Sequence, residues 1–486
     1  MKKKVLSVLL IGIMVIMSFT ACKGNKTAEN EETVSEPTST ATSETGSDST
    51  SETTVPNEFS TSPEQAEAYS AYAETLKEKY EGETLNVVSV SDPWVESMME
   101  VATEFEDLTG ATINFSTLGY DAAYSKETLI GSQSSDEADL FVYDIPWIGA
   151  LGDYLLPIDD FINKNAAMMD YEDFFSAARE ASAWNDQVLG VPFAPYYIML
   201  TYNTKMFKEA GVEVPTDFDE LKSAAAVLTT DSVAGIALNN QSGTCVGQAY
   251  FEYIYNMGGK PFESVYPGSE DYYADMTPLI NSKESLEVVK FFKDMLQYEG
   301  DGALNMAWNE RFSSFASGKA AIMIPWITDI TPLDDPEQSL ITDSYATAPT
   351  VMAEGIEQHT PIGGYSLGVS KFSKNQDLAK DFLAWFTTPQ TSYKFATTGG
   401  LPARYSLIND EALAAEYPYY MTMQQIVDTA FVAFRPQIPE SFEIMDTVGS
   451  YIGKYLDGSM ELGDAMNTAN SEVTKILEAA GYNVKE

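Results

Sequence analysis

Residues 85–110 read LNVVSVSDPWVESMMEVATEFEDLTG, a short strand followed by a helix. The strand, Leu85 to Val90, is rich in β-branched residues. In the helix, apolar residues recur at the spacing of one helical face and Gly110 provides the end; they are Val95, Met98, Ala102, Phe105 and Leu108. Further strands are expected over 111–115 and 139–143. This alternation of strands and helices predicts an α/β fold with largely parallel strands.

A leader helix is expected before this unit. Tyr69, Tyr72, Leu76 and Tyr80 share one helical face, so we predict a helix within residues 66–83 that packs on the folded part. Two later helix starts are also marked. Thr216 and Ser373 each offer a hydroxyl at the N-cap position, with an acid or amide three residues later.

The N-terminus has the pattern of a secretory signal peptide over residues 1–21. Three lysines at 2–4 precede an apolar run over 5–17, which at about 13 residues is too short to span a bilayer, where roughly 20 are needed. The step FTAC at 19–22 resembles the lipobox of bacterial lipoproteins, except that Phe19 stands where Leu is usual. We therefore expect lipidation of Cys22, the alternative being cleavage near Ala21 and free secretion.

Residues 22–65 are expected to form a tether. This stretch is rich in Ser, Thr and Glu, and its first part contains no aromatic residue up to Glu58. Such a composition cannot bury enough apolar surface to offset the entropy of the chain, so we predict disorder. A glycosylated stalk or a spacer through a thick cell wall would have the same composition.

The whole chain is strongly acidic. Its 486 residues carry a net charge of −45, and removing three signal-peptide lysines gives −45 − 3 = −48. Such a surface repels nucleic acids and anionic lipids. Besides Cys22 there is only Cys245, so the mature protein has no intramolecular disulfide and depends on an apolar core. Cys245 itself is expected to be a small buried residue.

Motifs for several kinds of chemistry are missing from the sequence. There is no Walker-type phosphate loop, no G-x-S-x-G elbow and no H-E-x-x-H zinc motif, and His359 is the single histidine. We expect no cofactor, no metal and no enzymatic activity. Paired carboxylates remain possible among 73 acidic residues, which leaves a glycoside hydrolase as an alternative.

Four segments occur in a characteristic order. They are PFAPYY (192–197), which continues through LTYNTKMF (200–207) and AGV (210–212); FASGKAAIMIPW (315–326); GGYSLGV (363–369) with SKN (373–375) and the helix over 379–386; and GGLPAR (399–404). In this order they resemble the family 1 extracellular solute-binding proteins of carbohydrate ABC importers, the group that includes maltose-binding protein. The resemblance covers most of residues 84–486.

The resemblance implies a two-lobed periplasmic-binding-protein-like fold of type II, whose lobes are joined by crossing hinge strands and close on a ligand. One lobe is expected over 84–195 plus 365–408 and the other over 197–360 plus 412–486. The implied partners are a carbohydrate ligand and the permease subunits of an ABC importer. The implied state is a monomer held by its lipid at the extracellular face of the cell membrane.

Sugars present apolar faces and a rim of hydroxyls, so their pockets need aromatic planes and fixed polar groups. Trp94, Trp147 and Trp326 each lie close to an aspartate, and the first two follow predicted strands, where ligands of open α/β sheets bind. Each tryptophan taken alone could equally be part of the core. With the family pattern, the expected ligand-binding residues are Asp92, Trp94, Tyr120, Asp144, Trp147, Tyr196, Trp308, Trp326, Asp329, Tyr365 and Arg404.

Three different functions stay open at this level. The same fold could bind a peptide, a polyamine or an anion, since a fold does not fix its ligand. An anion would need converging basic residues, and the 28 in this chain are scattered. Arg404 and Arg435 stand out among them, although an arginine in so acidic a chain more often pairs with a structural acid. The chain could also be a lipid-anchored hydrolase, or a sensor that presents its ligand to a signalling receptor.

Overall fold

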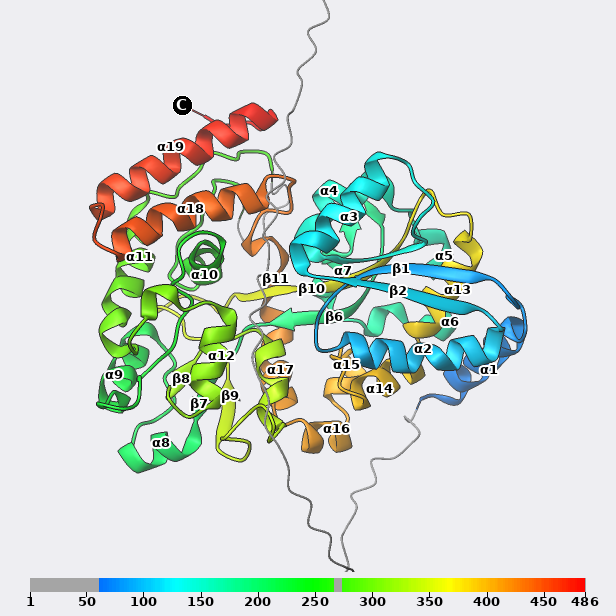
Figure 1. Cartoon of the computed structure of the whole chain (residues 1–486), viewed down its shortest axis with the longest axis horizontal. Helices are drawn as coiled ribbons and strands as arrows, with labels where there is room; N and C mark the ends of the chain where they lie inside the picture. The colour runs from blue at the N-terminus through cyan, green and yellow to red at the C-terminus, as the bar shows by residue number, and fades with distance from the viewer. Residues whose placement is uncertain (1–60, 266–272, 486) are drawn as a thin grey trace, which may run out of the picture. The chain divides into compact units, whose positions relative to one another are not determined.

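A six-stranded mixed sheet organises the first of two cores (Figure 1). The computed structural model describes residues 61–265 and 273–485, so the predicted signal peptide, Cys22 and all but the last residues of the tether lie outside the described residues. The strands are β1 (Thr84–Val90), β2 (Thr112–Leu118), β3 (Leu140–Asp144), β6 (Val191–Tyr197), β10 (Thr360–Val369) and β11 (Ala430–Phe431). Their order is β11-β10-β3-β1-β2, with β6 also paired to β10.

The strands predicted from the sequence form the parallel half of this sheet. β1 pairs in parallel with β2 and with β3, in the registers Leu85↔Ile113 and Val87↔Leu140. Because β2 and β3 flank β1 on opposite sides, right-handed crossovers put α2 (Val95–Thr109) and α3 (Tyr120–Ser132) on opposite faces of the sheet (Figure 1). The other half is antiparallel, since β10 runs against both β3 and β6.

The other elements of this first part are helices and one short hairpin, β4–β5. They are α1 (Pro63–Leu76), α4 (Ile148–Leu151), α5 (Asp159–Lys164), α6 (Ala166–Met169), α7 (Ser176–Ala181), β4 (Ala183–Trp184), β5 (Gln187–Val188), α13 (Gln376–Phe386), α14 (Pro389–Thr397), α15 (Tyr405–Ile408), α16 (Glu411–Glu416) and α17 (Tyr420–Ile426). Apolar faces of α2, α7 and α13 bury residues in one continuous hydrophobic cluster with the sheet, which makes the first core.

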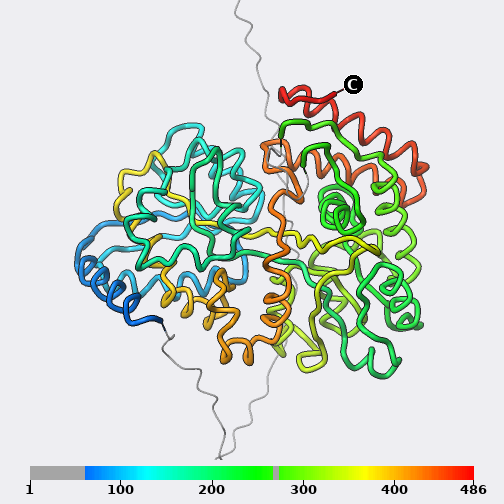
Figure 2. Tube along the Cα trace, turned by 180° about the vertical axis from the view of Figure 1, so that it is seen from behind, coloured from blue at the N-terminus to red at the C-terminus, as the bar shows by residue number. Residues whose placement is uncertain are grey.

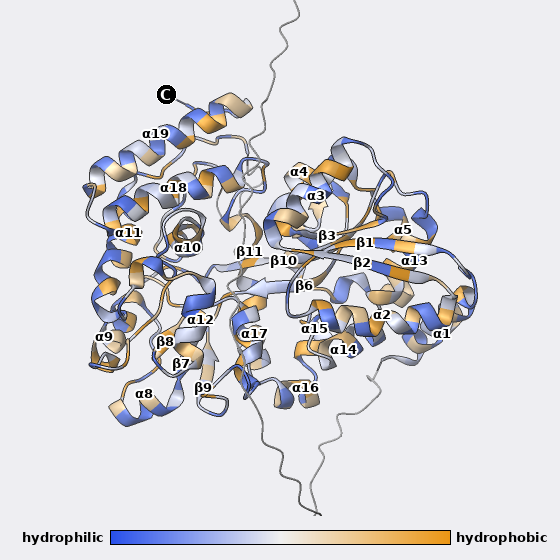
Figure 3. Cartoon of the chain, in the orientation of Figure 1, coloured by the Kyte–Doolittle hydropathy of each residue, from blue (hydrophilic) through white to orange (hydrophobic). Residues whose placement is uncertain are grey.

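The second core is mainly helical around a small antiparallel sheet of order β8-β7-β9. Its elements are β7 (Leu200–Asn203), α8 (Thr204–Ala210), α9 (Phe218–Leu228), α10 (Thr244–Ile254), α11 (Lys283–Met295), α12 (Trp308–Ala316), β8 (Ile322–Met323), β9 (Tyr345–Ala348), α18 (Ser441–Leu456) and α19 (Leu462–Ala480). Figure 3 shows the alternating polar and apolar colouring of α18 and α19, which bury one face each against this core.

Glycines allow α10 and α18 to pack with their backbones close together. A Cβ added to Gly247 would lie 2.0 Å from the carbonyl oxygen of Met445, and one added to Gly449 would lie 1.9 Å from that of Gly243. No side chain could be accommodated at either distance. This close crossing fixes the start of α10 beside the middle of α18.

Three stretches of chain connect the cores. β6 leaves the first sheet at Tyr197 and continues into β7, while β10 enters that sheet at Thr360 and pairs with β6 in the register Gly363↔Tyr196. The third stretch is β11, which pairs with β10, followed by η9 (Val432–Phe434). Seen from behind, the orange segment that contains it runs between the two cores (Figure 2).

Helix starts differ in detail from the predictions. The leader helix is α1, which begins at Pro63 behind a capping box made by Ser62 and Gln65 and ends at Leu76, so Tyr80 lies beyond it. The predicted caps Thr216 and Ser373 are wrong by one and two residues. Asp217 caps α9, and Asn375 precedes α13. Ser373 instead donates to the buried Asp139 at 2.6 Å, a stronger partner than a helix end.

Candidate functional site

A cavity with a volume of about 410 Å³ lies where the three connecting stretches meet. Both cores contribute to its wall, and no single element provides more than a few of the lining residues. They are Tyr120, Asp121, Asp144, Tyr196, Thr244, Gln248, Trp308, Trp326, Thr328, Gly363, Gly364, Tyr365, Arg435 and Phe442. We call this the central pocket.

Six aromatic residues give the central pocket its apolar planes. Tyr196 and Tyr365 stand on neighbouring strands with ring centroids 5.6 Å apart and nearly perpendicular planes. Trp326 comes from the second core and packs its ring against Phe434. A Cβ at Gly363 would lie 3.4 Å from the Trp326 ring, an ordinary van der Waals contact, so the indole lies directly against the β10 backbone. The pocket thus presents ring surfaces from both cores.

A buried polar network crosses the pocket wall. Asp144, the last residue of β3, accepts a hydrogen bond from the Tyr120 hydroxyl and one from Arg435 Nη2 at 3.3 Å. Arg435 Nη1 donates to Gln248 at 3.1 Å, and the Gln248 amide donates to Glu252 at 2.9 Å. Burial raises the pKa of Asp144, and Arg435 and the Tyr120 hydroxyl oppose that rise. The network therefore offers both donors and acceptors beside the aromatic planes.

The structure brings six of the predicted site residues to the central pocket. Those residues are Tyr120, Asp144, Tyr196, Trp308, Trp326 and Tyr365. Register explains part of the grouping, because Tyr365 pairs with Asp144 across β10 and β3, and Gly363 pairs with Tyr196 across β10 and β6. Trp308 begins α12 and is held by Asn239, whose amide oxygen accepts from the indole Nε1 at 3.3 Å.

Asp92 and Trp94 lie behind the pocket wall. The buried Trp94 donates from Nε1 to the Tyr196 hydroxyl at 2.7 Å, and the Asp92 carboxyl group lies beside the same hydroxyl. Burial raises the pKa of Asp92 to about 7; the Tyr196 hydroxyl opposes this, while Asp144 and Asp329 add to it. Both residues fix the orientation of the Tyr196 ring, and neither lines the pocket.

Trp147 and Asp329 are also set back from the cavity. Trp147 is 1% exposed and packs its ring 4.9 Å from that of Tyr120 and 5.3 Å from that of Tyr124. Asp329 accepts from Arg311 Nη2 at 2.7 Å. Trp147 supports a lining residue from inside the first core, and Asp329 neutralises a buried arginine.

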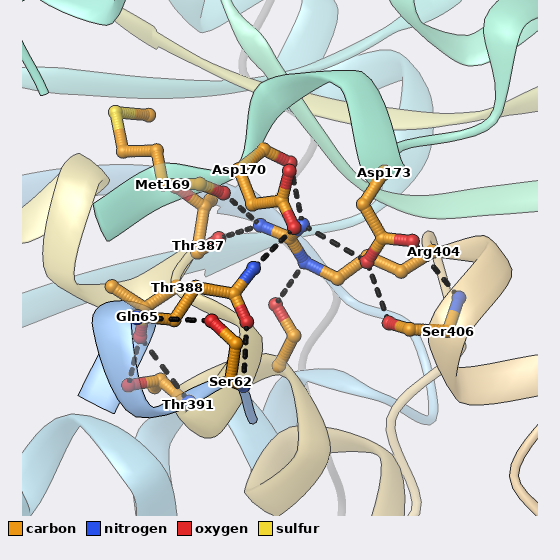
Figure 4. Close-up of polar contacts among 11 residues, drawn as sticks. Ser62, Gln65, Met169, Asp170, Asp173, Thr387, Thr388, Thr391, Arg404 and Ser406 are labelled. Atoms are coloured by element: carbon orange, nitrogen blue, oxygen red, sulfur yellow. Dashed lines mark hydrogen bonds and ion pairs between the residues drawn. The ribbon is translucent and has the colours of Figure 1, made fainter. Parts of the chain in front are cut away.

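Arg404 is the centre of a buried polar cluster outside the pocket (Figure 4). Its guanidinium donates to the backbone carbonyls of Met169, Asp170 and Thr387 and to the carboxylate of Asp173, and it stacks 3.8 Å from the Phe174 ring centroid. Asp170 in turn accepts from Gln65 of α1 at 2.5 Å. With no exposed surface and every direction occupied by protein acceptors, Arg404 joins separate loops of the first core.

Several lining residues were not predicted from the sequence. Gln248 and Thr244 stand on α10, Phe442 is the second residue of α18, and Arg435 follows η9. Their neighbours in sequence show no strand end and no family motif that would single them out. Arg435 stood out only because basic residues are scarce in this chain. The same argument pointed equally to Arg404, which lies outside the pocket.

The described residues contain no group of three or more His, Cys, Asp or Glu placed to hold a metal ion. Within the same residues, no helix combines the length and apolar character needed to cross a membrane. Cys245 is buried, and burial raises its pKa to about 12.

Comparison with known proteins agrees with this geometry. A family model described as bacterial extracellular solute-binding protein matches residues 91–392. A probable amino-acid ABC transporter periplasmic-binding protein of Sinorhizobium fredii is 24% identical over 354 residues, 71% of this chain and 78% of that protein.

Solved structures show the same fold. A solute-binding protein of Agrobacterium radiobacter in complex with ribitol is 26% identical with a TM-score of 0.74, covering 82% of this chain and 99% of that one. A maltose-bound protein of T. maritima is 17% identical with a TM-score of 0.71, covering 81% and 100%. These confirm the two-lobed type II fold, and the family, which binds solutes, confirms that the chain is not an enzyme. Because the family model spans more than half of the sequence, the chain belongs to the bacterial extracellular solute-binding proteins.

Proposed function

We propose that this protein binds a neutral polyhydroxylated solute, a sugar or a sugar alcohol, in the central pocket and delivers it to the permease of an ABC importer. The observation that carries this proposal is the combination of six aromatic residues with the Tyr120–Asp144–Arg435–Gln248 network around one cavity. Rings can stack on the apolar faces of a sugar, and the network can exchange hydrogen bonds with its hydroxyls. The ribitol complex of a related protein supports the same solute class.

The lobes expected over 84–195 plus 365–408 and over 197–360 plus 412–486 are proposed to close on the solute, with the first lobe extended to residue 427 because α16 and α17 pack in the first core. A ligand that touches both lobes binds the closed form more tightly and shifts the population toward it. The ligand-contacting residues are then the six predicted residues that line the pocket, together with Gln248 and Arg435. Asp92, Trp94 and Trp147 act by supporting Tyr196 and Tyr120 from behind.

Thermal unfolding with and without ribitol, maltose and a panel of other mono- and oligosaccharides, amino acids and polyamines tests the solute class. We expect a sugar or sugar alcohol to raise the unfolding temperature. Trp326→Ala removes a stacking plane from the pocket wall. This variant should abolish the rise and any ligand-induced change in fluorescence, because an aromatic ring contributes a large, specifically oriented contact area.

The matched control for this variant is Trp184→Ala. Trp184 is half-buried in the β4–β5 hairpin and does not line the central pocket. A Trp326→Ala protein that folds and keeps the parent affinity would remove Trp326 from the site. A response to amino acids alone would overturn the sugar assignment, and turnover of a glycoside would overturn the transport role.

An amino acid is the second candidate, since one relative is described as an amino-acid binding protein. Its carboxylate would need a cationic partner, and the arginine that lines the pocket already pairs with Asp144. A neutral solute requires no new charge compensation, so we favour the sugar or sugar alcohol.

We also propose that Cys22 carries a lipid and that the predicted tether, shortened from 22–65 because α1 begins at Pro63, holds the protein at the outer face of the cell membrane. Anchoring would raise the local concentration of the protein near its permease. Cys22→Ala should move the protein from the membrane fraction into the medium, as should globomycin in the parent strain. A parent protein that is already free in the medium would contradict anchoring while leaving solute binding untouched.

A further inference from the structure

Arg435 occupies an unusual place among the lining residues. It follows η9 on the third stretch that connects the cores and is 5% exposed, yet it lines the central pocket. The preceding strand β11 pairs with β10, so the arginine is tied to a second connecting stretch as well. It therefore stands at the junction of the pocket and the connections on which lobe closure would turn.

The two ends of the guanidinium bind acceptors that belong to different cores. Nη2 donates at 3.3 Å to Asp144, which ends β3 of the first sheet, and Nη1 donates at 3.1 Å to Gln248 on α10 of the second core. Arg311, the other buried arginine near the pocket, pairs with Asp329 and the Ile324 carbonyl, both within 18 residues of it in the sequence. The guanidinium is planar and its N–H donors are fixed, so Arg435 can bind Asp144 and Gln248 together only when these two acceptors are at one particular distance from each other.

Separating the cores would break one of these two bonds. If the bond from Arg435 to Asp144 broke, the buried Asp144 carboxylate would keep only the Tyr120 hydroxyl and its backbone donors. If the bond to Gln248 broke, the side-chain amide of Gln248, which also donates to Glu252, would lose Arg435 as its donor. Either loss leaves a buried polar group less well compensated, so the bridge favours the arrangement in which the cores are close.

The same guanidinium faces the space for the ligand. A Cβ built on Gly363 would lie 3.6 Å from Arg435 Nη2 and 3.4 Å from the Trp326 ring, so the arginine and the indole border the same gap above the β10 backbone. A solute stacked on Trp326 is within reach of this donor. A hydroxyl that accepts from a guanidinium makes a charge-assisted hydrogen bond, stronger than one from a neutral donor.

From these contacts we propose that Arg435 couples occupancy of the central pocket to lobe closure. It donates to the solute while joining Asp144 of one lobe to Gln248 of the other, so a bound hydroxyl compound stabilises the bridged state. The ligand part of this inference rests on the proposed function, whereas the bridging part applies to the ligand-free protein too.

The test measures the distance between the lobes in Arg435→Gln. Spin labels are attached to Leu129→Cys on α3 and Val227→Cys on α9, which are 50% and 58% exposed in the parent, in a full chain carrying Cys22→Ala. Double electron–electron resonance then gives the distribution of distances between the two labels, without ligand and with ribitol or maltose as probes. We expect Arg435→Gln to lengthen and broaden the ligand-free distribution, and to weaken binding of an active probe about 10- to 100-fold.

Two further variants keep the result interpretable. Arg435→Lys retains the charge but cannot bridge both acceptors with one fork, so its distances should resemble those of Arg435→Gln while its fold is preserved. Arg179→Gln is the control, because Arg179 pairs with Glu172 within the first core and lies outside the pocket.

The outcomes separate this inference from the proposed function. Parent-like distances and affinity in both Arg435 variants would overturn the coupling, even if the parent binds sugars. Widened distances in a protein that responds to neither probe would support the bridge and count against the sugar assignment.

Discussion

Glu127 is a buried acid with no side-chain partner among the described residues. It stands on α3 with no exposed surface, and burial raises its pKa well above the usual range, opposed only by a backbone contact with Val142. The folded protein therefore keeps a proton that the unfolded chain releases above a pH of about 4.3. The free energy of unfolding should fall as the pH rises above that value and through the raised pKa, by at most about 1.4 kcal/mol per pH unit from this group.

Glu127→Gln should remove this part of the pH dependence. Relative to the parent, the variant gains free energy of unfolding between pH 5 and pH 8, as measured by urea denaturation at both pH values. Glu96→Gln, on the exposed face of α2, is the control and should parallel the parent. Equal pH profiles for all three proteins would show that Glu127 ionises in the folded state without cost.

Individual residues also show where sequence reasoning stops. Trp326 and Trp147 follow similar patterns of strand and aspartate, yet one lines the pocket and the other lies inside the first core. Arg404 and Arg435 were equally noticeable, and each binds acids and carbonyls far away in sequence. Which of two similar residues reaches the cavity depends on partners 100 to 300 positions away, which local patterns do not encode.

The leader helix and the turn after it bind a buried carboxylate of the first core. Asp381 on α13 accepts from the Tyr72 hydroxyl at 2.7 Å, from Lys79 at 2.7 Å and from the Tyr80 hydroxyl at 2.6 Å, and it is 8% exposed. Burial and the neighbouring carboxylate raise the pKa of Tyr72 and of Tyr80, so both hydroxyls stay protonated and can donate at neutral pH. One donor in α1 and two in the turn that follows it thus bind the same buried carboxylate, in addition to the contact of Gln65 with Asp170.

Asp381→Asn should loosen this attachment, because the amide carries no charge and turns one acceptor into a donor. We expect the free energy of unfolding to fall by about 2–3 kcal/mol, with the half-exposed Lys79 contributing least. Urea denaturation measures the loss, and faster proteolysis within residues 63–80 would locate it. Asp377→Asn, an exposed acid on the same helix, is the control; an equal effect of both variants would contradict a specific role for Asp381.

The sequence predicted which helices and strands exist better than it predicted the residues at which they begin and end. The strand at 84–90 and the helix at 95–109 with its αL cap at Gly110 are confirmed almost to the residue, since β-branching, helical periodicity and glycine act locally. Helix α1 ends earlier than predicted, because Glu78 adopts a positive φ and leads the chain back to place Tyr80 against Asp381. There a tertiary contact overrides helical periodicity.

For the whole molecule, the fold class followed from the order of strands and helices together with the family resemblance. The composition of the cores could not be predicted from the sequence alone. The second core takes residues from both the middle of the chain and its C-terminal end, as when α10 packs on α18 through Gly247 and Gly449. The central pocket likewise needs residues from Tyr120 to Phe442, so it exists only after both cores have formed.

One detail of the connecting strands bears on how such a molecule can move. Gly364 has a φ of +98°, and an added Cβ would lie 2.1 Å from the carbonyl oxygen of Ala194, so β10 and β6 touch main chain to main chain where they leave the first sheet. Because no side chain separates the two strands at this point, β6 and β10 can twist together while the hydrogen bonds between them persist. Bending is then shared along a thin ribbon instead of being concentrated at a flexible loop, so any movement of the two halves should follow one reproducible path.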